Sequence, residues 1–112
     1  MRVIVAGSIE WLDIEKIRDE LVKLPLGTTI VCGVVSGSSY FVPKIADELR
    51  LEIEEWPTEI TLHGTKATAV RNQEMVDSGA DLCVAFPIDN CRETWDCIRR
   101  ARGAHIETII VK

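Results

Sequence analysis

The sequence predicts an α/β protein. We expect a Rossmann-like three-layer sandwich, in which a five-stranded parallel sheet lies between helices on both faces. Short apolar segments rich in β-branched residues alternate with longer amphipathic segments, as they do where helical crossovers join parallel strands. Glycine or proline follows most of the apolar segments, where a strand has to turn. The 112 residues suit one domain with its own core, so we expect a single domain over residues 1–112.

Five segments are predicted as strands because they are apolar and β-branched. The third alternates apolar with acidic residues, as an edge strand with one face in water does. The predicted strands are residues 2–6, 28–32, 51–56, 81–86 and 107–111. Right-handed crossovers bring every segment that follows a strand to one edge of the sheet. We therefore look for a functional site among the residues that follow the strands.

Four segments are predicted as helices, from apolar residues at helical spacing. They are residues 12–24, 38–50, 67–78 and 94–102. Ser38 or Ser39 is a candidate N-cap for the second helix, and Thr94 for the fourth. Pro43 fits the second helix only if it lies in about the first turn, since it has no amide hydrogen to donate.

Charge and hydropathy exclude two classes of function. Thirteen basic and eighteen acidic side chains give a net charge of −5, which argues against direct nucleic-acid binding because that needs a basic surface. A small anionic ligand stays possible, since one pocket can be positive on an acidic protein. No apolar segment is long enough to span a membrane. Residues 1–6 resemble a strand rather than a signal peptide, so we expect a cytoplasmic protein without membrane contact.

The four cysteines do not have the spacing of a metal site. There is no Cys-x-x-Cys pair, and Cys32 and Cys83 lie within or at the end of apolar segments. Buried free thiols are the expected outcome for them. Cys91 and Cys97 lie on either side of a predicted helix start, with no histidine or carboxylate to complete a ligand set. We expect no metal and no cofactor.

Two glycine-containing turns are candidate anion sites. Gly7 and Ser8 follow the first strand and can offer a backbone amide and a hydroxyl to a ligand. A simple tight turn explains them equally well. The second turn follows the second strand, where glycines let backbone approach a phosphate closely. It contains Gly33, Ser36, Gly37, Ser38 and Ser39. It matches neither the Walker A loop nor the dinucleotide fingerprint.

Two further pairs have a functional and a structural interpretation. Arg71 and Asn72 can hold a phosphate or a base edge with a guanidinium and an amide. From the residues alone, a solvated helix face explains them better. Glu93 and Asp96 lie near the start of the fourth helix, where the helix dipole favours acidic side chains. Catalytic carboxylates are the alternative, and the structural interpretation is favoured.

Taken in order, these segments resemble the small YspA-like (YpsA-related) branch of the SLOG superfamily of Rossmann-like domains. The resemblance covers essentially the whole chain. Its specific parts are Gly64-Thr65-Lys66-Ala67 followed by Arg71-Asn72-Gln73-Glu74-Met75, and the helix that opens with Thr94-Trp95-Asp96. It implies the strand order 3-2-1-4-5. It also implies a bacterial or phage protein with a site for a nucleotide or nucleotide-derived ligand at the carboxyl edge of the sheet.

The resemblance assigns roles to residues by position. Its ligand-binding candidates include Lys66 and Thr94, in addition to Gly7, Ser8, Gly33, Gly37, Arg71 and Asn72. Five positions depart from the family pattern. The family has arginine where this chain has Ile9 and Ser36, and aspartate where it has Ser39. It has glycine where this chain has Val34 and Glu93. Added Cβ atoms hinder the approach of backbone to a ligand, and Glu93 repels an anion.

Three functions follow as alternatives. The first is binding, sensing or sequestration of a nucleotide-derived ligand. The second is hydrolysis of an N-glycosidic bond in a nucleoside monophosphate, with Glu93 or Asp96 as the acid/base. The third is a degenerate site in a protein that acts through a partner or as a homodimer or higher homo-oligomer.

Overall fold

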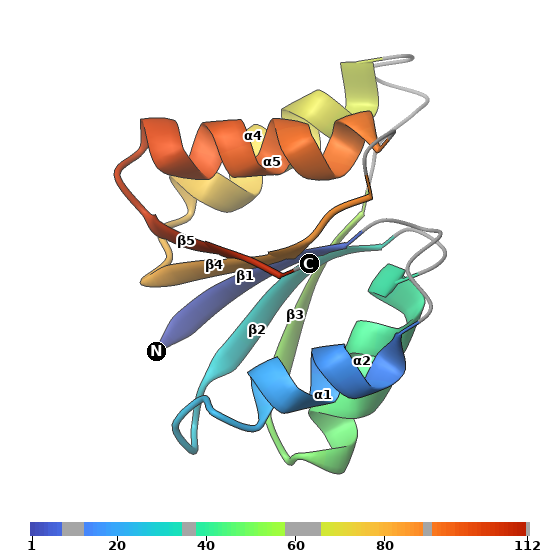
Figure 1. The fold of residues 1–112 in the computed structure, drawn as a ribbon. Coiled ribbons are helices and arrows are strands. Elements are labelled where there is room, and N and C mark those ends of the chain that lie inside the picture. The colour runs from blue at the N-terminus through green and yellow to red at the C-terminus, as the bar shows by residue number, and fades with distance from the viewer. Residues whose placement is uncertain (8–12, 35–37, 58–65, 89–90, 112) are drawn as a thin grey trace.

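Five parallel strands form one sheet in the order β3-β2-β1-β4-β5, as predicted. The computed structural model describes residues 1–7, 13–34, 38–57, 66–88 and 91–111. Helices α1 and α2 cover one face of the sheet, and α4 and α5 cover the other (Figure 1). The elements in chain order are β1 (Arg2–Gly7), α1 (Ile14–Leu21), β2 (Thr29–Val34), α2 (Ser38–Glu48), β3 (Glu52–Pro57), α4 (Ala67–Asp77), β4 (Leu82–Phe86), α5 (Arg92–Gly103) and β5 (Glu107–Ile110).

The sheet has a hydrophobic core on each face. Successive residues of a strand point to opposite faces. Val3 and Val5 of β1 therefore pack with α1 and α2, whereas Ile4 and Ala6 pack on the side of α4 and α5. All five residues of the neighbouring strand β4 are buried, as expected for a parallel strand covered on both faces. This double burial explains the continuous apolar runs from which the strands were predicted.

Two helix boundaries and the place of one proline differ from the prediction. Helix α1 ends at Leu21 and not near residue 24. Helix α5 begins at Arg92 with Cys91 as its N-cap, so the prediction of Thr94 as the N-cap is wrong. The error arose because the Cys91 side chain makes no capping hydrogen bond, which leaves no sequence signal. Pro43 lies inside α2 as its sixth residue, in the second turn and beyond the place expected for it.

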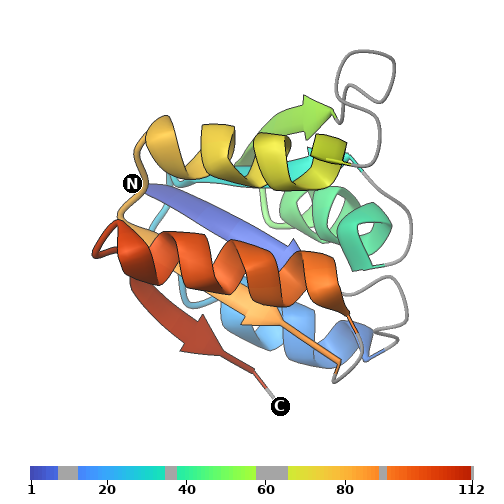
Figure 2. The ribbon, with the colours of Figure 1, turned by 90° about the horizontal axis from the view of Figure 1, so that it is seen from above.

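The topology places α4 and α5 side by side across the same face of the sheet (Figure 2). Their contact brings residues 71–73 close to residues 93–100, which lie more than 20 positions later in the chain. None of the described helices is both long and apolar enough to cross a membrane.

Candidate functional site

Arg71 lies at the centre of the site, on the fifth residue of α4. Its side chain is only 5% exposed, because α4 packs on the sheet and directs Arg71 toward β2. The guanidinium lies against Gly33, where an added Cβ would overlap its Nη1 and Cζ atoms. Gly33 is therefore the residue that makes room for the guanidinium. Arg71 and Asn72 are buried, so their interpretation as a solvated helix face is wrong.

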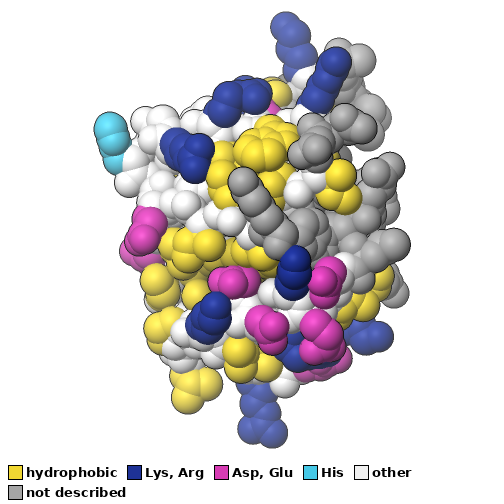
Figure 3. Space-filling view, in the orientation of Figure 1, with side chains coloured by type: hydrophobic (Ala, Val, Ile, Leu, Met, Phe, Trp, Pro, Cys, Tyr) yellow, Lys and Arg dark blue, Asp and Glu magenta, His cyan; other side chains and the backbone are white. Residues whose placement is uncertain are grey.

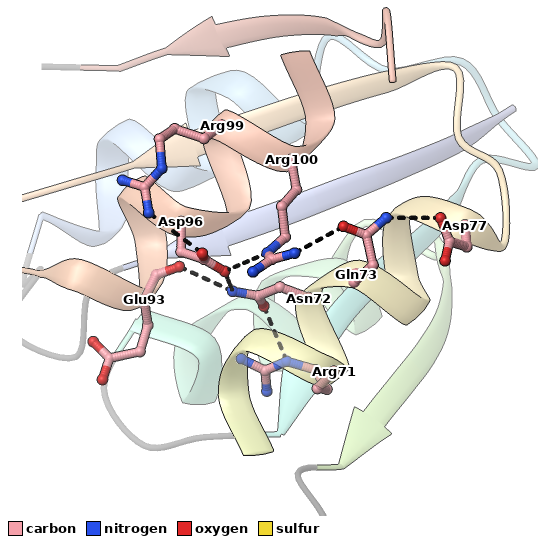
Figure 4. A network of polar contacts seen from close by, with 8 residues as sticks. All are labelled: Arg71, Asn72, Gln73, Asp77, Glu93, Asp96, Arg99 and Arg100. Atoms are coloured by element: carbon pink, nitrogen blue, oxygen red, sulfur yellow. Dashed lines mark hydrogen bonds and ion pairs between the residues drawn. The ribbon is translucent and has the colours of Figure 1, made fainter. Parts of the chain in front are cut away.

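Asn72 holds Arg71 in place and connects it to α5. The Nε–H of Arg71 donates to Oδ1 of Asn72 over 3.2 Å. Nδ2 of Asn72 donates to the backbone oxygen of Glu93 and to Oδ2 of Asp96, each over 3.1 Å (Figure 4). Asn72 is 2% exposed. Its two ends thus bind different partners, which fixes the direction of the amide and with it the guanidinium.

Asp96 serves this network as an anchor. Its carboxylate accepts a hydrogen bond from Nε of Arg100 over 2.8 Å and forms a longer ion pair with Arg99. Burial alone would raise the pKa of Asp96, but the hydrogen bonds from Arg100 and Asn72 together lower it. The carboxyl is therefore held ionised, which suits an anchor better than a general acid. Asp96 is not among the residues that line the cavity beside Arg71.

That cavity lies at the carboxyl ends of β1 and β2. It brings together six of the predicted residues from four elements, namely Gly7, Gly33, Arg71, Asn72, Glu93 and Thr94. Its enclosed volume is about 20 Å³, which holds about one water molecule. The enclosed part is thus the size of a small polar group and not of a whole nucleotide.

The guanidinium of Arg71 lacks a counter-ion in the described part of the chain. Nη1 is buried without a hydrogen-bond partner, and no ion pair joins Arg71 to a carboxylate there. Burial lowers the pKa of Arg71, while Cys97, Cys32 and Glu93 oppose that effect. A guanidinium stays protonated even so. A buried cation without a partner costs several kcal/mol, so this arrangement calls for a compensating anion.

A second unpartnered donor lies one strand away. Trp56 of β3 is the parallel register partner of Gly33. Its Nε1 is also buried without a hydrogen-bond partner among the described residues. The same edge of the sheet therefore holds two buried N–H donors without a described partner. One is Nη1 of Arg71, which lies against β2, and the other is Nε1 of Trp56 in β3. Buried donors are rarely left unpaired in proteins.

Glu93 and Thr94 belong to the first turn of α5. Thr94 is 3% exposed, and its hydroxyl lies 3.2 Å from Sγ of Cys91. The Glu93 side chain is exposed, and Figure 4 shows it directed away from Asp96 and Arg100. Among the described residues, the hydrogen-bond contact of its carboxylate is a weak one, 3.7 Å from Sγ of Cys91.

Several predicted residues lie elsewhere. Lys66 caps α4 and is exposed, and it borders a separate groove with Arg100 on the outer side of α4. Ser38 and Ser39 are the first two residues of α2, and the structure describes their backbone but not their side chains. Ser8, Ser36 and Gly37 lie outside the described residues, as does Ile9. Within the described ranges, no cluster of His, Cys, Asp and Glu side chains could hold a metal ion.

Met75 and Cys97 line the cavity and were not predicted. Each had a spacing signal, because Met75 lies four residues after Arg71 and Cys97 three after Thr94, on the same helix faces. The cysteines are all free, and Cys32, Cys83 and Cys97 are buried, as expected for Cys32 and Cys83. A hydrogen bond with Cys97, together with burial, raises the pKa of Cys83.

No family model matches the chain. Among curated proteins, the chain is similar to the Gene 61 protein of Mycobacterium phage D29, with 35% identity over 117 aligned positions. The alignment covers 96% of this chain and 94% of the phage protein. The chain belongs to the gene 61 protein family. The alignment spans nearly the full length of both proteins. The similarity therefore extends over the whole fold and not over one motif.

The name of the gene 61 family states no activity. The function of this member therefore has to be inferred from the chemistry of its site. The feature to explain is a buried, unpaired guanidinium beside Gly33 at the carboxyl edge of a parallel sheet.

Proposed function

We propose that the protein binds a nucleotide-derived ligand at the carboxyl edge of the sheet, with an anionic group of the ligand against Arg71. The observation that carries the proposal is the buried guanidinium with an unpartnered Nη1. An anion there would supply the missing counter-ion and hydrogen-bond acceptor. Charged hydrogen bonds of this kind are short and strong. Parallel α/β sheets generally bind ligands at this edge.

The surroundings of Arg71 also support an anion. The first turn of α5 borders the cavity through Glu93 and Thr94, and the amino end of a helix attracts negative charge. Figure 3 shows several Lys and Arg side chains over the α4–α5 layer with little acidic surface between them, whereas in the lower half of that view Lys and Arg side chains are interspersed with Asp and Glu. The acidic chain thus presents positive charge on this layer. The resemblance to SLOG domains supports a nucleotide as the source of the anion.

The decayed-site alternative has less support. A site that no longer binds an anion gains nothing from a buried guanidinium, because an apolar side chain of the same length would be as stable or more so. In this chain a buried Arg71 is positioned by Asn72 and given room by Gly33.

N-glycosidic hydrolysis remains the second candidate, and one observation favours it. Glu93 is among the residues that line the cavity beside Arg71, and its negative charge acts on the guanidinium of Arg71. Asp96 is bound by Asn72 and Arg100, so Glu93 would be the acid/base. Release of free base from nucleoside monophosphates, lost in Glu93→Gln, would identify an enzyme. Binding without product would leave the binding function alone.

A thermal-shift screen tests the proposed binding. The panel contains nucleoside mono- and diphosphates, cyclic nucleotides, cyclic dinucleotides and NAD-derived metabolites. A ligand at 100 times its Kd stabilises a protein by about 2.7 kcal/mol, which is several degrees in Tm. We expect a shift in the wild type and none in Arg71→Met. The control variant Arg99→Met removes an exposed arginine from the same layer and should keep the shift. A panel without any shift would contradict the proposal.

A further inference from the structure

Arg71 and Glu93 are the charged residues described at the cavity, and their side chains differ in how deeply they are buried. Among the described residues that line the cavity, one is cationic, Arg71, and one is acidic, Glu93. Arg71 is buried, so its charge acts through a medium that screens it weakly. Glu93 is exposed, so its charge is screened more strongly. Neither forms an ion pair within the described residues.

The two side chains are kept from neutralising each other. Asn72 and Gly33 hold the guanidinium against β2, while Glu93 is in the first turn of α5, where the helix dipole favours a carboxylate. Glu93 thus offsets the partial positive charge that α5 would otherwise offer to a ligand. What remains for the ligand is a single buried positive charge.

We propose that the site selects ligands that carry one negative charge at the group facing Arg71, such as a phosphodiester, over the dianion of a phosphomonoester. Glu93 is the residue that sets this preference. The first negative charge of a ligand is balanced by Arg71. A second negative charge meets no further cation among the residues that line the cavity, and it is repelled by Glu93. This inference rests on the proposed function and adds the charge class of the ligand.

Matched ligand pairs provide the test. A nucleoside 3′,5′-cyclic monophosphate carries one charge, and the 5′-monophosphate of the same nucleoside carries close to two at pH 8, because its second pKa is near 6. Pairs with adenine, guanine, cytosine and uracil are titrated calorimetrically into the wild type and into Glu93→Gln. The control is Glu107→Gln, which removes an exposed carboxylate at the amino end of β5, the opposite edge of the sheet.

We expect the wild type to bind the cyclic member of a pair more tightly. The repulsion from Glu93 scales with ligand charge, so Glu93→Gln should improve the monoanion by about fivefold and the dianion by about the square of that factor. The ratio of the two Kd values then narrows by about fivefold, and Glu107→Gln leaves it unchanged. Glu93→Gln should fold, because the side chain is exposed and the Asn72 contact uses the backbone oxygen of residue 93.

The outcomes separate this inference from the proposed function. The charge selection is overturned if the wild type prefers the dianion, or if Glu93→Gln leaves the ratio of the two Kd values unchanged. In either case, loss of binding in Arg71→Met would still support the anion site. Absence of binding by every member of every pair, together with a silent thermal-shift panel, overturns both.

Discussion

The guanidinium of Arg71 occupies the space that a side chain at position 33 would fill, so that Gly33 of β2 and Arg71 of α4 form one structural unit. The glycine lets a charged group lie directly on the backbone of the sheet, and the helix buries that group. Without a ligand anion, this buried and unpaired charge lowers the stability of the folded protein.

Replacing Arg71 with methionine should leave the protein as stable as the wild type or more stable. Methionine fills much of the same space, and it removes a buried charge that has no ion-pair partner in the described structure. Replacing even a paired buried charge with apolar groups is often neutral or stabilising by about 1 to 4 kcal/mol, and the lost hydrogen bond from Nε of Arg71 to Asn72 offsets part of that gain. Urea unfolding of Arg71→Met measures this. A large loss of stability would show that the guanidinium already has a compensating partner.

Replacing Gly33 with alanine should abolish ligand binding by displacing the guanidinium. The added Cβ would overlap Nη1 and Cζ of Arg71, and overpacking of this kind costs about 1 to 3 kcal/mol. The matched control is Gly103→Ala in the last turn of α5, where a Cβ meets no atom within 4 Å. Titration of a ligand found in the screen into both variants checks the prediction. Full affinity in Gly33→Ala would contradict the placement of the anion.

Replacing Asn72 with alanine should weaken both stability and binding. The substitution removes three hydrogen bonds and leaves the buried Nε–H of Arg71 without its acceptor. Each unsatisfied group costs about 1 to 3 kcal/mol, so Tm should fall by several degrees. The half-buried Gln73 is unsuitable as a control position because it also bonds Arg100. Thr108→Ala in β5, whose hydroxyl donates to the nearby Ile106 oxygen, serves instead and should change Tm little.

Asp96 should make the folded protein sensitive to acid. Hydrogen bonds from Arg100 and Asn72 outweigh burial and lower the pKa of this carboxyl below that of the unfolded chain. A lowered folded-state pKa stabilises the protein fully above the unfolded value, about 3.9, and the contribution is lost as the pH falls through the folded value. Asp96→Asn should therefore cost about 1 to 3 kcal/mol at pH 7, with a smaller deficit near pH 2.5.

Urea unfolding at the two pH values measures that difference. Asp47→Asn is the control, because Asp47 is exposed on α2, far from the α4–α5 contact. An equal deficit for Asp96→Asn at both pH values would mean that the charge of Asp96 contributes nothing to the network.

The cysteines should divide into one reactive and three protected thiols. Cys91 is partly exposed, whereas Cys32, Cys83 and Cys97 are buried. Burial raises the pKa of Cys32 to about 11, which leaves little thiolate to react. A thiol reagent should label one cysteine quickly in the native protein and all four in denaturant. Fast labelling of two or more would contradict the described core.

The fold was predictable because the central strands of a doubly covered sheet are almost wholly apolar, as β1 and β4 are. Residues of β1 and β4 point alternately into the two cores, so both strands appear in the sequence as continuous apolar segments. Helix starts were less predictable, as at α5, where Cys91 takes the N-cap position without a side-chain capping bond. The strand order came from the resemblance, since periodicity does not carry it.

The sequence predicted many of the residues of the site, but it did not predict how their side chains are buried and bonded. Residues that follow strands had to meet at one edge, which is how Gly7 and Gly33 came to line the same cavity. The burial of Arg71 was not predictable, because it depends on Gly33 removing a Cβ from another element. The role of Asp96 depends on Arg100 and Asn72, and the contact between two helices is a tertiary property that local spacing does not encode.

Calorimetric titration of the nucleotide panel into the wild type and Arg71→Met tests the central claim most directly. The account predicts saturable binding of at least one anionic ligand by the wild type and loss of that binding in a folded, equally stable Arg71→Met. Undiminished affinity in Arg71→Met would contradict it, because the ligand would then not depend on the one buried cation that the described structure leaves unpaired.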